Sequence, residues 1–263
     1  MCTLVILRRP KHNWPLLVAA NRDEMLARAW EAPGRHWPDR PTTIGGLDLE
    51  AGGSWLGLND YGVVAGVLNR PGALGPVKNK RTRGELVLEA LEHADAKVAA
   101  ETLSGIDGRS YRPFNMLIAD NCDAYWIAHR NNQNTSPVEV HTVPPGLSML
   151  TAHDLNDDTS PRIRTFLPRF SESAEPNPDS NEWSKWQELL ACRFHAENEG
   201  PTEAMNIVTD FGFGTSSRSL IALPALGKRN ILPIWNFASG YPNCGDYCPV
   251  ALEPEAASKH ATV

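Results

Sequence analysis

The sequence has no surplus of positive charge and no long apolar run. Its 263 residues carry 25 Lys and Arg against 31 Asp and Glu, a formal net charge of −6. Without a block of basic residues, a nucleic-acid-binding surface is not expected. No apolar stretch reaches the length of about 20 residues that a membrane-spanning helix needs. The first apolar run stops at Leu7, too early for the core of a signal peptide. We therefore expect a cytoplasmic protein with neither a membrane span nor a nucleic-acid partner.

The sequence is also poor in patterns that bind metals or form disulfides. Its five cysteines are an odd number and lie far apart, which favours a reducing compartment over a disulfide framework. None of its eight histidines has the spacing of a zinc site, and Cys244 and Cys248 are separated by three residues rather than two. No metal site is predicted.

What is present is a series of antiparallel hairpins interrupted by helices. Strands are expected at 2–7 and 16–20, and further hairpins at 54–69, 113–129 and 219–237. Apolar residues at helical spacing predict helices at 82–94 and 181–197, with a weaker candidate at 95–103. Thr82 and Glu85 match a capping box at the start of the first helix. The pattern predicts an α+β class: one domain over 1–250, followed by a flexible tail at 251–263.

The first hairpin brings chemically versatile residues to the start of the chain. If Leu7 pairs with Leu16, Cys2 lies opposite Asn21. The tetrapeptide Asn21–Glu24, "NRDE", then surrounds the thiol with an amide, a guanidinium and two carboxylates. Cys2 is either a small buried strand residue or a nucleophile, and the residues alone leave both interpretations open.

The second interpretation has a specific chemistry. Removal of Met1 ahead of a small residue would free the α-amino group of Cys2. That amine has a reference pKa of about 8 against about 8.5 for a thiol, so it can accept the thiol's proton. Arg22 would favour the thiolate, and Asp23 would hold the α-ammonium group.

Other residues indicate packing or pocket formation. Gly45–Gly46 and Gly52–Gly53 are interpreted as turns or close backbone approaches. Ser216, Ser217 and Ser219 are expected to begin a strand that faces the nucleophile. Trp37, Trp55 and Trp126 are candidates for the wall of a pocket.

The motif "NRDE" behind a Met-Cys hairpin resembles the signature of the NRDE family, which comprises the transport and Golgi organization 2 (TANGO2) proteins. Further segments resemble later blocks of that family in order: "GGSWLGLNDYGVVAGVLNRPG", "TRGELVLEAL", "PFNMLIAD", "LSMLTAHDLNDDTSPRI" and "GTSSRSLIAL".

The family is in turn similar to N-terminal-nucleophile hydrolases of the cholylglycine hydrolase and penicillin V acylase group. That resemblance implies a four-layer αββα sandwich. It assigns Cys2 as nucleophile and Asp23 as the ligand of the α-amino group, and it places Asn69 on the oxyanion side. Arg162 corresponds to a late active-site arginine.

Two positions depart from the pattern of these hydrolases. The arginine of that group falls on Ala20, so Arg22 is displaced from it. An oxyanion-donating asparagine of the group falls on Ala152, and losing such a donor costs a few kcal/mol. His153 replaces the donor if the two sequences are shifted by one position. Asn21, Arg22, Glu24, His153 and Trp55 are the expected ligand-binding side chains.

Two functions follow as expectations. The first is hydrolysis of a small amide or acyl bond through Cys2, with no cofactor required. The second, implied by the family resemblance, is non-catalytic binding and trafficking of haem, or of acyl-CoA or lipid, on the same scaffold. A scaffold with neither activity is the third alternative. In the first two cases the partner is a small molecule.

Overall fold

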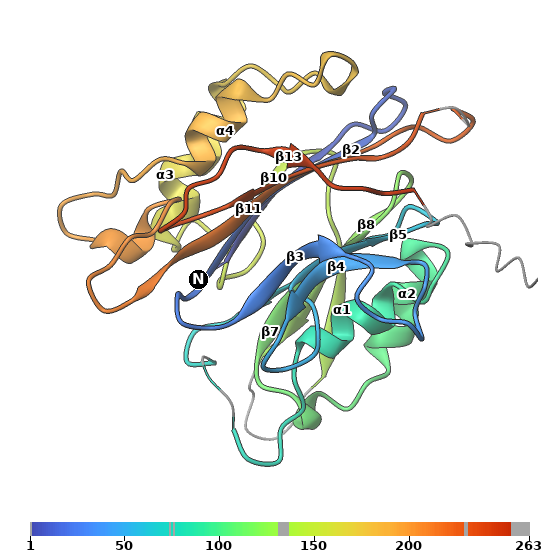
Figure 1. Ribbon diagram of the computed structural model, residues 1–263, viewed down its shortest axis with the longest axis horizontal. Coiled ribbons are helices and arrows are strands. Elements are labelled where there is room, and N and C mark those ends of the chain that lie inside the picture. Colours follow the sequence, from blue (N-terminus) through green and yellow to red (C-terminus); the bar gives the residue numbers. More distant parts are fainter. Residues whose placement is uncertain (1, 74, 76, 131–136, 229–230, 254–263) are drawn as a thin grey trace, which may run out of the picture.

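Two antiparallel sheets form the centre of the protein (Figure 1). The computed structural model describes residues 2–73, 75, 77–130, 137–228 and 231–253. The first sheet has the order β10-β1-β2-β11-β12-β13 and the second runs from β3 to β9 in sequence order. The strands of the first sheet are β1 (Thr3–Arg8), β2 (Leu16–Met25), β10 (Gly146–Leu150), β11 (Phe213–Leu223), β12 (Ile234–Ser239) and β13 (Cys248–Pro249). Those of the second are β3 (Trp30–Gly34), β4 (Thr43–Asp48), β5 (Leu56–Asn59), β6 (Val64–Asn69), β7 (Phe114–Ala119), β8 (Ala124–His129) and β9 (Val138–Thr142).

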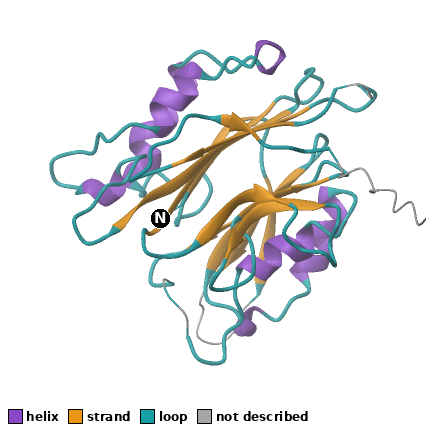
Figure 2. Ribbon diagram, viewed as in Figure 1, coloured by secondary structure: helices purple, strands orange, loops and turns teal. Residues whose placement is uncertain are grey.

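Helices cover the outer face of each sheet (Figures 1 and 2). Helices α1 (Gly84–Ala90) and α2 (Ala96–Ser104) pack on the seven-stranded sheet. Helices α3 (Pro161–Glu172) and α4 (Ser184–Leu190) pack on the six-stranded sheet. Short 3₁₀ turns occur at Gly108–Ser110, Pro178–Ser180 and Pro201–Glu203. The layers are therefore helix, sheet, sheet, helix, and the predicted αββα sandwich is confirmed.

The alternation of side chains along β1 shows how the core is divided. Leu4 and Ile6 belong to the apolar cluster between the two sheets. Val5 and Leu7 point the other way and pack against α3 and α4. Successive strand residues face opposite sides of a sheet, so the even positions of β1, including Cys2 just before it, face the second sheet.

The hairpins predicted from the sequence are present. Strands β5 and β6, β7 and β8, and β11 and β12 pair as antiparallel neighbours. The register expected for the first hairpin is wrong by one residue, because Arg8 joins the strand and pairs with Leu16. Thr3 pairs with Asn21, and continuing this register sets Cys2 opposite Arg22.

The helices agree less well with the sequence expectations. The segment at 95–103 matches α2, but the helix expected at 181–197 is confined to Ser184–Leu190. The predicted capping box is wrong. The Thr82 hydroxyl accepts from the nearby Gly84 N–H, and Glu85 pairs with Arg81 instead of capping the helix.

Helix α3 was not expected from the sequence. Ser160 caps its first turn and Pro161 occupies the next position, which are favourable start signals. Pro168 lies inside the helix and obscures them, because proline is unfavourable in a helix interior.

Of the helices that the structure describes, none is long and apolar enough to cross a bilayer. The predicted tail at 251–263 falls mainly on residues 254–263, which lie outside the described residues. The single-domain boundary at residue 250 stays a prediction.

Candidate active site

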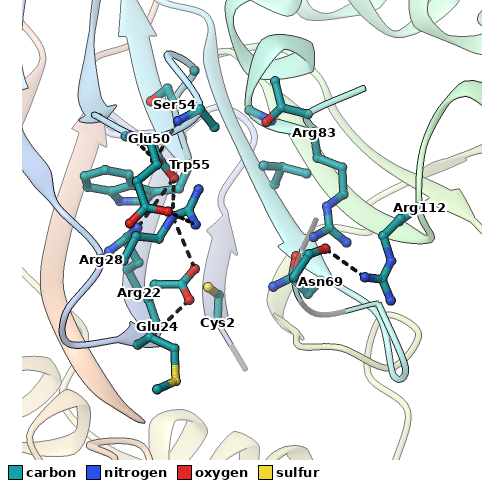
Figure 3. Close-up of a pocket in the computed structure, with 18 of the residues that line it drawn as sticks. Cys2, Arg22, Glu24, Arg28, Glu50, Ser54, Trp55, Asn69, Arg83 and Arg112 are labelled. Atoms are coloured by element: carbon teal, nitrogen blue, oxygen red, sulfur yellow. Dashed lines mark hydrogen bonds and ion pairs between the residues drawn. The ribbon is translucent and has the colours of Figure 1, made fainter. Parts of the chain in front are cut away.

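A cavity of about 670 Å³ opens at the ends of the strands next to Cys2. Figure 3 shows that Cys2, Arg22, Glu24, Arg28 and Trp55 gather on one side and that Arg83 and Arg112 lie on the other. The other residues that line the cavity are Met25, Ala27, Asp48, Glu50, Ala51, Gly53, Ser54, Val67, Asn69, Gly75, Val77, Lys80, Arg81, Thr82, Gly84 and Phe213. The volume is in the range of small-molecule sites.

Cys2 lines this cavity and stays close to the NRDE segment. Its thiol donates to the backbone carbonyl of Asp23 at 3.7 Å. Burial raises the pKa of the Cys2 thiol and the Asp23 charge raises it further, while Arg22 lowers it by a smaller amount. The thiol therefore needs a base before it can act as a nucleophile at neutral pH.

Asp23 is held in a buried polar network on the other face of β2. One carboxylate oxygen accepts from the Thr215 hydroxyl at 2.6 Å, and the other accepts from Arg162 at 2.9 Å. Arg162 also donates to the Thr3 hydroxyl at 2.7 Å and to the carbonyl of Thr202. Helix α3 thus brings the guanidinium of Arg162 to the pair of strands that carry Cys2 and Asp23.

Arg22 faces the cavity because it alternates with Asp23 along β2. Its guanidinium lies 4.4 Å from the centre of the Trp55 ring and donates to the Ser216 hydroxyl at 2.9 Å. Asp48 lies 3.8 Å away. Burial lowers the pKa of Arg22, opposed by the nearby Cys2 and carboxylates. The cation is therefore held in place by an aromatic face and by a hydroxyl from β11.

A β-bulge in β11 orients that hydroxyl. Thr215 pairs with Asp23 and Ser217 pairs with Arg22, so Ser216 is the extra residue. The chain comes close to Gly240 here: a side chain at Gly240 would overlap the backbone of Thr215, and the Gly240 N–H donates to the Ser216 carbonyl. The bulge directs Thr215 to Asp23 and Ser216 to Arg22, a use of bulges that is frequent beside active sites.

Asn69 and Ala152 occupy different surroundings. Asn69 ends β6 and lines the cavity with Cys2. Ala152 is buried just beyond β10, the strand next to β1. His153 does not line the cavity, and its ring points to Asp157, with 3.9 Å between the ring nitrogen and the carboxylate.

The remaining residues expected in the site divide between the cavity and other places. Glu24 and Trp55 line the cavity, whereas the Asn21 amide donates to the carbonyls of Leu190 and Met205 below the sheet. Neither Trp37 nor Trp126 is among the lining residues. Ser217 and Ser219 line a small adjoining cavity together with Cys2.

A match to a family model over most of the chain shows the family. The family model described as Transport and Golgi organisation 2 matches residues 1–228. The chain belongs to this family. A curated relative, the Transport and Golgi organization protein 2 homolog of Bos taurus, is 34% identical over 115 residues. That match spans 42% of this chain and 40% of the length of the relative.

Two solved structures with a fold similar to that of this chain are hydrolases. The Caenorhabditis elegans N-acylethanolamine-hydrolyzing acid amidase ortholog has a TM-score of 0.57 at 14% identity, covering 86% of this chain and 94% of that one. A conjugated bile acid hydrolase from Clostridium perfringens has a TM-score of 0.52 at 10% identity, covering 99% and 100%. At these identities the likeness shows a shared fold, that of N-terminal-nucleophile hydrolases.

Sequence patterns did not identify the cavity-lining residues at 80–83 and at 112. Their proximity depends on a backbone contact: a side chain on Gly53 would come within 2.5 Å of the Gly84 carbonyl carbon, and the Ser54 N–H donates to the Gly84 carbonyl. The expectation of close backbone approach at Gly52–Gly53 was the available signal. It did not identify the partner segment, because that segment is about 30 residues further along the chain.

Asn115 was also missed. Its buried amide donates to the carbonyls of Thr151 and His153, at 2.9 and 2.6 Å. It therefore holds the turn that carries Ala152.

Proposed function

We propose that this protein hydrolyses a small amide or acyl bond through Cys2. The observation that carries the proposal is the placement of the Cys2 thiol in a ligand-sized cavity, hydrogen-bonded to Asp23, whose carboxylate is fixed by Arg162 and Thr215. The fold supports this chemistry, since two solved structures that share it are hydrolases.

In the proposed reaction Met1 is first excised, so that the α-amine of Cys2 is free. The amine takes the thiol's proton, and the thiolate attacks the substrate carbonyl carbon to form a C–S bond. The C–N or C–O bond, or the C–S bond of a thioester substrate, then breaks, and the protonated amine returns the proton to the leaving group. Water, deprotonated by the same amine, attacks the thioester and releases the acid and the thiol.

Each surrounding group has a role that its position supports. The Asp23 carboxylate orients the ammonium form of the amine, and Arg162 holds that carboxylate in place through an ion pair. Asn69, on the cavity wall, donates to the oxyanion. Arg22 stabilises the thiolate from its place beside Trp55.

The experiment is turnover of a panel of short N-acyl amides and acyl thioesters by the wild-type chain and by Cys2→Ala. The proposal expects turnover that Cys2→Ala abolishes, with Cys192→Ala as the matched control because Cys192 is partly buried outside the cavity. Equal rates for wild type and Cys2→Ala would refute it.

A second candidate, carriage without turnover, is supported by one observation. Ala152 is buried and apolar where the related hydrolases carry an oxyanion donor, and His153 is not among the residues that line the cavity. In this alternative the cavity holds haem, or an acyl-CoA or lipid, as cargo. If haem is the cargo, a haem titration followed by Soret absorbance should show a saturable shift at micromolar protein. A linear, non-saturable response would exclude haem as the cargo.

A further inference from the structure

The cavity beside Cys2 has charges of opposite sign on its two walls. The wall built from β2, β4 and the following turn carries Glu24, Asp48 and Glu50. Arg28 lies among these carboxylates, 2.7 Å from Asp48 and 2.9 Å from Glu50. The basic charge on this wall is thus neutralised by neighbouring acids.

The facing wall is different, and we call Lys80, Arg83 and Arg112 the basic wall. Arg83 donates to the backbone carbonyls of Ala73 and Pro113, at 2.9 and 3.0 Å. Lys80 donates to the carbonyl of Arg109. Across the described part of the chain, no carboxylate lies within ion-pair distance of Lys80 or Arg83.

Arg112 brings a further cation to the same wall. It donates to the carbonyls of Gly75 and Gly72, and these two hydrogen bonds hold the loop beside the cavity. Burial, and to a smaller extent the charge of Arg112, lowers the pKa of Arg83 to about 10. Two guanidinium groups that repel each other on a concave wall are stabilised together by a bound anion, because each can donate paired hydrogen bonds to its oxygens.

A backbone contact joins the basic wall to the segment on the opposite side of the cavity. Arg83 immediately precedes α1, and the Gly84 backbone is packed on Gly53 and Ser54. Ser54 is followed by Trp55, the residue on which Arg22 lies. Cys2 and the basic wall therefore face each other across one cavity whose walls are joined by direct backbone contact.

From this arrangement we infer that Arg83, Arg112 and Lys80 form an anion subsite for a carboxylate or phosphate group of the ligand. The inference deepens the proposed function and rests on it only for the reaction at Cys2. Met25 and Phe213 add apolar surface to the cavity, and exposed Phe211 stacks on Phe213 with ring centres 6.4 Å apart. A short alkyl chain is therefore a suitable carrier for the anionic probe.

The test is calorimetric binding of octanoate, octyl phosphate and uncharged octanol to the full chain carrying Cys2→Ala, in which turnover cannot interfere. We expect at least one anion to bind about tenfold or more tightly than octanol, because a charge-assisted pair is worth that factor. Arg112→Gln and Arg83→Gln should each weaken the anion about tenfold and leave octanol within twofold. The preferred anion tells a carboxylate from a phosphate ligand.

Lys78→Gln is the matched control, because Lys78 is exposed on the same loop and does not line the cavity. The substitution removes one positive charge, as each arginine variant does. It should leave all three dissociation constants unchanged. Thermal melts identify a variant that fails to fold, and the binding data of the other arginine variant then test the anion subsite. Octanol binding as tightly as both anions, or a folded arginine variant with an unchanged anion constant, overturns the inference. Failure of turnover in the wild type, with anion binding intact, would refute the proposed function alone.

Discussion

Replacement of Arg162 by Met should sharply destabilise the protein, because it removes the guanidinium that forms an ion pair with the buried Asp23 carboxylate. The Arg162 side chain is 1% exposed and that of Asp23 is fully buried, with 2.9 Å between them. Breaking such a pair from one side costs about 3–5 kcal/mol of unfolding free energy. This loss is expected even though the intact pair itself contributes much less to stability, since the penalty comes from taking the guanidinium away from a buried carboxylate.

The measurement is urea unfolding followed by circular dichroism, extrapolated to water. The double variant Asp23→Asn/Arg162→Met removes both charges and should recover part of the loss. Arg164→Met is the matched control on the same helix. Arg164 is 53% exposed and pairs with Glu199, so its loss should cost at most about 1 kcal/mol. Equal costs for Arg162→Met and Arg164→Met would refute the reasoning.

Further predictions concern the cavity's supports and the thiol. Gly53→Ala should lower the melting temperature more than Gly52→Ala, because only the first forces a side chain into backbone, although Gly52 has a positive φ of 72°. In a thermal melt the reverse order would contradict this. Asn115→Leu should cost about 2–4 kcal/mol in urea unfolding, since it takes the Asn115 donor from the buried Thr151 carbonyl and the partly buried His153 carbonyl; a cost below about 1 kcal/mol would show that the turn does not depend on it. In the chain that keeps Met1, alkylation of Cys2 should reach its half-maximal rate at a higher pH than a peptide thiol, because burial and Asp23 raise its pKa. Mass spectrometry of the Cys2 peptide across pH measures this, and an equal or lower midpoint would count against it.

Much of the scaffold was predictable because its signals are local. The turns at 60–63 and 120–123 contain Asn, Asp and Gly between apolar strands, and both hairpins form as the pattern indicates. The first hairpin was predicted with its register shifted by one, since the loop from Arg9 to Pro15 contains no turn signal that fixes its length. Such a shift exchanges the two faces of a strand, so only the structure determines that Arg22 and Cys2 share a face.

The site itself was predictable in part, and for a different reason. Cys2, Asp23, Asn69 and Arg162 were located by resemblance, and the structure shows that Arg162 reaches Asp23 from a helix that the pattern did not predict. The basic wall was not predicted, because no pattern relates Arg83 or Arg112 to a strand about 60 to 110 residues earlier. The positions of these arginines depend on tertiary packing. For Arg83 the contact is between the backbones of its neighbour Gly84 and of Gly53, which leaves no side-chain pattern in the sequence.

Whether Cys2 acts as an N-terminal nucleophile is tested most directly by intact-mass and peptide mapping after treatment with a limiting amount of an electrophilic thiol probe. We expect a chain that lacks the mass of Met1 and carries a single adduct, located on Cys2 and not on the exposed Cys122, Cys244 or Cys248. A chain that retains Met1, with label spread over the exposed cysteines and none on Cys2, would contradict it.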